Sequence, residues 1–124
     1  SDQTKKYPSD AESAFEKLRS ELSQEAALTL TQALIEMLPG KRQELERTFE
    51  TDERETISRF GHSMKSICRM NGLHELAELT AELEVSAKDL NKQDLEDLIK
   101  VIQREIKDAE INLTKLVQTH SLTV

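Results

Sequence analysis

Apolar residues recur every three or four positions along most of the chain, and this spacing predicts amphipathic α-helices rather than strands. Four long segments carry such a stripe, at about residues 24–49, 52–71, 73–88 and 91–116. A shorter amphipathic segment follows Ser9, where Ser9 and Glu12 match a capping box. Four long helices joined by short connections close most economically around one axis. The pattern therefore predicts an all-α fold, an antiparallel four-helix bundle with a short extra N-terminal helix.

Proline, glycine and capping residues mark where these helices should bend, begin and end. Pro39 removes a helical hydrogen bond, and we expect a kink rather than a break because the apolar register resumes beyond Gly40. Asp52 and Glu55 match a capping box for the next helix. Gly72 suits the left-handed position just past the end of that helix, which gives it a structural role.

The first residues of the chain differ from the remainder. Residues 1–8 are polar, contain Pro8 and show no helical period, so we interpret them as a disordered lead or linker. Residues 9–120 are assigned to the helical bundle. A chain of 124 residues has room for one hydrophobic core, and we expect a single domain.

The segment between Asp52 and Gly72 divides its side chains between two faces. At about 100° per residue, its apolar members fall within about 60° of Met64, and this face should be buried. The face consists of Ile57, Phe60, Gly61, Met64, Ile67 and Cys68. His62 lies about 160° from Met64 and should therefore face solvent.

Small polar and basic residues surround His62 on the predicted exposed face. They are Ser58, Arg59, Lys65, Ser66 and Arg69. An exposed imidazole is mostly neutral at about pH 7.5, and neighbouring cations favour an incoming anion. His62 is therefore a candidate acceptor for an anionic group, with Lys65 one turn away to offset the charge. The alternative is that both residues are ordinary solvated residues of a helix surface.

The composition limits the classes of function. Acidic residues outnumber basic ones by 24 to 17, and the net charge of −7 argues against general nucleic-acid binding. No apolar run is long enough to span a membrane, and the first residues lack the apolar core of a signal peptide. Cys68 is the only cysteine, so an internal disulfide is impossible. These features are typical of a cytoplasmic protein.

Several other kinds of chemistry lack support in the sequence. The chain contains no Gly-rich phosphate-binding loop, so we do not expect it to phosphorylate itself from ATP. His74 precedes a glutamate but lacks the second histidine of a zinc-binding helix, and no metal site is predicted. We expect no cofactor of its own.

The order of residues around the histidine resembles a known family. Lysine follows the histidine at plus three, glycine at plus ten and leucine at plus fourteen, with a Leu-Glu pair beyond. The matching residues are His62, Lys65, Gly72, Leu76, Leu83 and Glu84. This register resembles the histidine-containing phosphotransfer (HPt) domain, the helical phosphocarrier of multistep two-component signalling. The apolar-Pro-Gly run at 34–40 also looks like this family, and the resemblance covers roughly residues 26–116.

The resemblance implies a function and a partner. His62 would accept a phosphoryl group from the aspartate of a receiver domain and pass it to another receiver, while Lys65 would stabilise the phosphate charge. The aspartate and a Mg²⁺ ion would come from the receiver. The receiver-docking face would include Ser58, Arg59, Ser66 and Arg69. Ser66 stands where the family usually has glycine, yet its small side chain permits close approach and its hydroxyl can donate to a phosphoryl oxygen.

Two other functions remain open from the sequence. The chain could be a helical adaptor without chemistry that binds a partner through an exposed helix face. It could also be a degenerate phosphotransfer fold that docks on a receiver without transferring phosphate. If it is a phosphocarrier, it could stand alone or form the terminal domain of a hybrid sensor histidine kinase.

Overall fold

The computed structural model describes residues 9–121, and the predicted lead at residues 1–8 lies outside the described residues. The described part consists of five helices and contains no strand, so the predicted all-α fold is confirmed. The helices are α1 (Asp10–Glu21), α2 (Gln24–Thr51), α3 (Arg54–Met70), α4 (His74–Ser86) and α5 (Lys92–Ser121).

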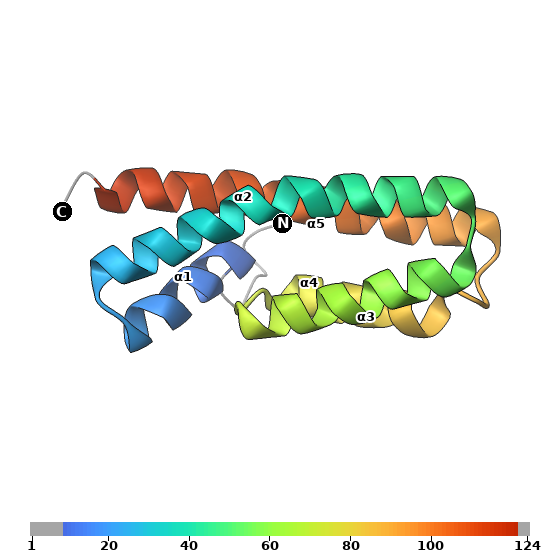
Figure 1. Cartoon of the computed structure of the whole chain (residues 1–124), viewed down its shortest axis with the longest axis horizontal. Helices are drawn as coiled ribbons and strands as arrows, with labels where there is room; N and C mark the ends of the chain where they lie inside the picture. The colour runs from blue at the N-terminus through green and yellow to red at the C-terminus, as the bar shows by residue number, and fades with distance from the viewer. Residues whose placement is uncertain (1–8, 122–124) are drawn as a thin grey trace, which may run out of the picture.

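The five helices form an elongated bundle (Figure 1). The long helices α2 and α5 lie side by side in opposite directions, and α3 and α4 form an antiparallel pair against one end of them. The short α1 packs at the other end, where it contacts α2, α5 and α4. This arrangement is the antiparallel four-helix bundle with an extra N-terminal helix that the sequence predicts.

Helix α2 continues through its proline. Pro39 lies inside the helix, which extends unbroken from Gln24 to Thr51. In Figure 1 the ribbon of α2 changes direction about half-way along, so the predicted kink is present and a break is not. The first half of α2 contacts α1 as well as α5, and the second half continues along α5.

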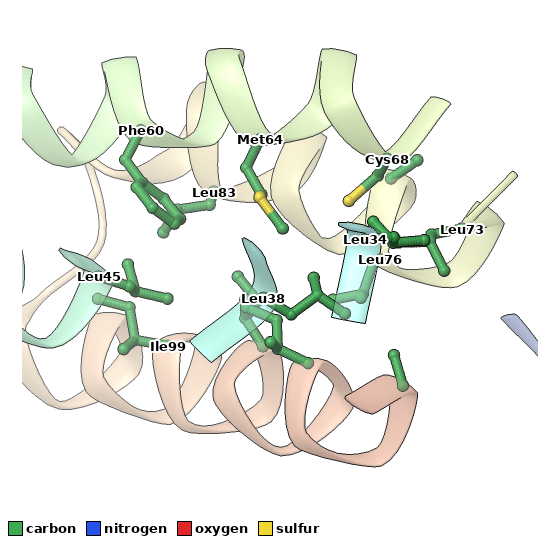
Figure 2. Packing of buried hydrophobic residues seen from close by; sticks show 14 of the residues in the cluster. Leu34, Leu38, Leu45, Phe60, Met64, Cys68, Leu73, Leu76, Leu83 and Ile99 are labelled. Atoms are coloured by element: carbon green, nitrogen blue, oxygen red, sulfur yellow. The ribbon is translucent and has the colours of Figure 1, made fainter. Parts of the chain in front are cut away.

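Apolar side chains from the helices meet in one core (Figure 2). Phe60, Met64 and Cys68 of α3 point toward Leu38 and Leu45 of α2, and all five are buried. The predicted burial of Met64 and Cys68 is therefore confirmed. Desolvation in this core raises the pKa of the Cys68 thiol to about 12, so the thiol stays protonated and unreactive.

The prediction for Ile67 is wrong in degree. Ile67 is half-buried and packs against the margin of the core rather than inside it. Its position about 60° from the centre of the apolar face of α3 explains this outcome, because a residue at the flank of a stripe contacts the core on one side only.

The sequence predicted the C-terminal end of α3 correctly but not the cap at its N-terminal end. Asp52 takes a left-handed conformation at the end of α2 (φ 54°), and no side chain caps the first turn of α3, so the predicted Asp52–Glu55 capping box is wrong. Gly72 has the expected positive φ of 75°. The Leu73 N–H donates to the carbonyl of Cys68 at 2.9 Å, which completes a Schellman motif.

A carboxylate from α1 caps the start of α4. The backbone N–H groups of Glu75 and Leu76 donate to the two carboxylate oxygens of Asp10, at 2.8 and 2.9 Å. Asp10 is buried, and no side chain of α4 itself performs this capping. A contact between residues far apart in the chain therefore holds α1 against the bundle and favours the charge of Asp10 at a helix N-terminus.

Helices α3 and α4 approach each other most closely at Gly61. A Cβ atom on Gly61 would lie 2.7 Å from the backbone nitrogen of Glu84 and 2.8 Å from the carbonyl oxygen of Thr80. Both distances are shorter than real Cβ contacts, and the atoms belong to the backbone, so no side-chain rotation can relieve them. Only glycine permits this spacing of the two helices.

Substitution of alanine for Gly61 should destabilise the fold, with Gly40→Ala as the matched control. Gly40 also lies in a helix, but a Cβ there meets nothing within 4 Å. Gly40→Ala should therefore stabilise by about 0.5–1 kcal/mol through helix propensity. Gly61→Ala has the same propensity gain but forces α4 away, at an overpacking cost of about 1–3 kcal/mol. Urea unfolding of both variants measures the difference. Equal stabilisation by both would show that the two helices are not in close contact.

Candidate functional site

His62 lies in the middle of α3 on the side that faces solvent. Its side chain is 63% exposed, as the angular position predicts. The residue follows Gly61 directly, so the imidazole stands beside the closest contact between α3 and α4. A reactant can therefore approach the ring from solvent while α4 contacts its other side.

One carboxylate on α4 contacts both predicted reactive residues. Glu84 Oε2 lies 2.7 Å from His62 Nδ1, and Glu84 Oε1 accepts a hydrogen bond from Lys65 Nζ at 2.6 Å. The two contacts use different oxygens of the same carboxylate. His62, Lys65 and Glu84 together are called the His62 site below.

The contact with Glu84 determines which ring nitrogen of His62 is available. An ionised carboxylate can only accept, so the 2.7 Å contact is a hydrogen bond when Nδ1 carries the proton. In the neutral ring Nε2 then carries the lone pair and takes no part in the Glu84 contact, on a side chain that is 63% exposed. In that tautomer the Glu84 contact orients the ring and leaves Nε2 as the nitrogen that can act as a nucleophile.

The charges of the site are balanced in this state. Lys65, and to a lesser degree His62, hold the pKa of the Glu84 carboxyl below its ordinary value of 4.5. The Lys65 side chain is only 18% exposed, so its ammonium group depends on Glu84 for compensation. An anion that arrives at His62 would meet a lysine that is already ordered nearby.

The other predicted site residues occupy different environments. The half-buried Ser58 donates from Oγ to the carbonyl oxygen of Glu84 at 2.7 Å, in the contact between α3 and α4. Ser66 is exposed, and its Oγ donates to the carbonyl oxygen of His62 at 3.3 Å. Arg59 and Arg69 are exposed on α3. A docking role for these four residues stays a prediction.

Glu84 is the residue of this site that sequence reasoning missed. The glutamate was visible as part of the Leu83-Glu84 pair in the family register, yet nothing in its own helix assigned it a role. Its partners are 22 and 19 residues away in sequence. Only the pairing register of α3 and α4, fixed at Gly61, brings Glu84 opposite His62.

The described part of the chain also bears on metal binding and membrane insertion. Within residues 9–121, no group of three or more His, Cys, Asp or Glu side chains is placed to hold a metal ion. None of the helices in this part of the chain is both long and apolar enough to cross a membrane.

Comparison with known proteins identifies one family. The model of the Hpt domain matches residues 29–113, which is well over half of the chain and includes all three residues of the His62 site. Comparison with curated proteins and with solved structures gave no match.

The pKa of Glu84 offers a test of this geometry. Lys65→Ala should raise that pKa toward 4.5, and by more than His62→Ala does, because the Lys65 hydrogen bond is the larger cause of the shift. Since the folded-state pKa is lowered, the Lys65–Glu84 pair is fully formed above pH 4.5 and is lost as the pH falls through the lower value. Carbon-13 NMR of the glutamate carboxyls measures the titration. Lys92→Ala, which removes an exposed lysine at the start of α5, is the control. A larger effect of His62→Ala than of Lys65→Ala would contradict the assignment.

Proposed function

Because this chain belongs to the Hpt domain family, we propose that His62 is its phosphoacceptor. The family has a histidine phosphotransfer role in phosphorelays, and its members are phosphocarriers rather than kinase domains. Hpt domains interact with receiver domains. In the proposed reaction, His62 takes a phosphoryl group from the aspartate of one receiver and gives it to the aspartate of another. A cytoplasmic location goes with this role.

The observation that carries this proposal is that Glu84 contacts Nδ1 of an exposed His62 ring, which leaves Nε2 as the nitrogen available to react. In the first transfer, the Nε2 lone pair forms a bond to phosphorus as the bond between phosphorus and the aspartyl oxygen breaks. The electron pair of that bond returns to the receiver carboxylate. No proton has to move, because Nε2 carries none at the start.

Glu84 also favours the second transfer. The phosphorylated ring with a proton on Nδ1 is positively charged, and Glu84 stabilises that charge through the 2.7 Å contact. A cationic imidazole is a good leaving group, so it departs as a neutral ring when the next aspartate attacks phosphorus. Glu84 therefore acts as a positioning residue in both directions of transfer.

Lys65 is proposed to stabilise the phosphoryl group on His62. Its ammonium group has three donors and uses one of them on Glu84, so others can bind phosphoryl oxygens. Phosphoryl transfer depends mainly on positioning and on stabilisation of charge. We propose that the receiver supplies the remaining part, a Mg²⁺ ion with the aspartate.

Conversion of His62 to glutamine should abolish phosphate acceptance. The chain would be incubated with receiver domains carrying a radioactive aspartyl phosphate and then tested for acid-labile label. His62→Gln should acquire none, while its thermal stability changes little because exposed substitutions cost within about 0.5 kcal/mol. His74→Gln, an exposed histidine on α4, is the matched control and should be labelled normally. If the wild-type chain acquires no label but still binds receivers, the degenerate phosphotransfer fold is favoured. If it acquires no label and binds no receiver, the adaptor function is favoured.

Variants of Ser66 distinguish two possible roles of its side chain. If the position requires only a small residue, Ser66→Gly should transfer at least as fast as wild type. Ser66→Leu should be slower by about a hundredfold, because a displacement of about 1 Å from in-line geometry has an effect of that size. If the hydroxyl contacts the phosphoryl group, Ser66→Gly should be slower than wild type. Stopped-flow transfer rates and receiver affinity measure these effects, and an unimpaired Ser66→Leu would show that receivers dock elsewhere.

A further inference from the structure

A groove lies between α2 and α5, the two long helices that lie side by side in Figure 1. Its volume is about 400 Å³, and residues of α2 and α5 alone line it. The His62 site belongs to α3 and α4, so the groove and the phosphotransfer face use different helices. The α2–α5 groove is not needed for the proposed phosphotransfer reaction.

Three residues that line the α2–α5 groove are apolar, and together they are called its floor below. Ile35 and Pro39 contribute from α2, and Ile111 contributes from α5 with 43% of its surface exposed. Pro39 has no N–H, so the carbonyl of Ile35 lacks the donor that a regular helix would supply. Burial of this apolar surface by a second molecule is favourable, whereas the free carbonyl gains only if that molecule supplies a hydrogen-bond donor.

The rim of the groove is positively charged. Lys107 and Lys115 lie along it, exposed, and neither forms an ion pair with any residue in the described part of the chain. The acidic lining residue, Glu110, is already neutralised by Arg42, which donates to both of its carboxylate oxygens. The groove therefore presents net positive charge on a protein whose net charge is −7.

A second hollow continues the groove along the same two helices. It has a volume of about 310 Å³ and shares Lys107. Its other charged lining residues are Arg42, Arg104 and one glutamate, Glu46, so the cations outnumber the carboxylates here as well. From Arg104 to Lys115 the cationic row extends about 17 Å along α5, at about 1.5 Å per residue. Three turns of a partner helix have this length.

We propose that the α2–α5 groove binds an amphipathic helix of a partner protein, with acidic residues on both sides of the apolar stripe of that helix. A concave surface with an apolar floor fits the apolar face of a helix, and the lysines of the rim fit its acidic flanks. A membrane surface fits poorly, because Ile35 is half-buried and Ile111 is 43% exposed, which leaves little apolar surface to insert into a bilayer. A partner bound here leaves His62 accessible to receivers.

Synthetic peptides test the proposal directly. One helical peptide of about 18 residues would carry leucines at helical spacing between glutamates, and a second would replace every glutamate with lysine. Each would be titrated into the full chain and followed through backbone amide shifts. The acidic peptide should shift amides near Ile35 and Ile111 in a saturable, salt-dependent manner, while the basic peptide should not. Equal shifts with both peptides, or none with the acidic one, would overturn the proposal.

Variants of the chain then identify the contacts. Lys107→Glu combined with Lys115→Glu should weaken acidic-peptide binding by at least about tenfold. Ile111→Ser should weaken it by about tenfold, the equivalent of about 1.4 kcal/mol of apolar burial. Lys92→Glu makes the same charge change on α5 outside the groove and should have little effect.

Two further measurements separate this inference from its rivals. All variants should accept phosphate on His62 as wild type does, so a failure of phosphotransfer would leave the peptide result intact, and the reverse also holds. Vesicles of anionic phosphatidylglycerol should not shift the groove amides. Vesicle binding that is lost in the double lysine variant would assign the groove to a membrane surface and overturn the proposal of a partner helix.

Discussion

The contact of α3 with α4 at Gly61 sets the geometry on which the His62 site depends. Because Gly61 has no side chain, the backbone nitrogen of Glu84 and the carbonyl oxygen of Thr80 can lie only 2.7 and 2.8 Å from the position that a Cβ atom would occupy. Glu84 can then reach both His62 and Lys65 with one carboxylate, and Ser58 can donate to the Glu84 carbonyl. A wider spacing of the two helices would leave the imidazole without an orienting partner. A backbone position without chemistry of its own thus controls the chemistry of its neighbour.

The same carboxylate serves two residues with different needs. Lys65 is largely buried and needs a counter-charge when no phosphate is present, whereas His62 needs an acceptor for its Nδ1 proton. A phosphoryl group on Nε2 would add negative charge beside both. Lys65 would then have two anionic partners, and Glu84 would face a cationic ring. In the proposed reaction the site would therefore be electrostatically complementary to the phosphorylated form, whereas the Lys65–Glu84 ion pair is present in the free form.

The sequence predicted the elements and the position of the histidine because both follow from local periodicity. The angular separation of His62 from Met64 placed one outside and the other inside, and Gly72 marked the end of α3. The sequence could not predict contacts that depend on how helices pair. Asp52 ended α2 instead of capping α3, since the linker is too short to supply both functions, and Glu84 acquired its role only from a neighbouring helix. The capping role of Asp10 was likewise not predictable from the sequence, because its two hydrogen bonds come from a helix more than sixty residues later in the chain.

The cap that Asp10 provides links local order in α4 to the docking of α1. A helix as short as α4 is marginal alone, and side chains from other helices hold both of its ends. Asp10 binds the N–H groups of the first turn, and Arg54 donates to the carbonyl oxygens of Ala87 and Leu90 at the far end. Detachment of α1 would free the amides of Glu75 and Leu76 to exchange with solvent before the core opens. The hydrogen-exchange rates of these two amides therefore report a sub-global opening of the N-terminal helix, and α1 and the first turn of α4 behave as one cooperative unit.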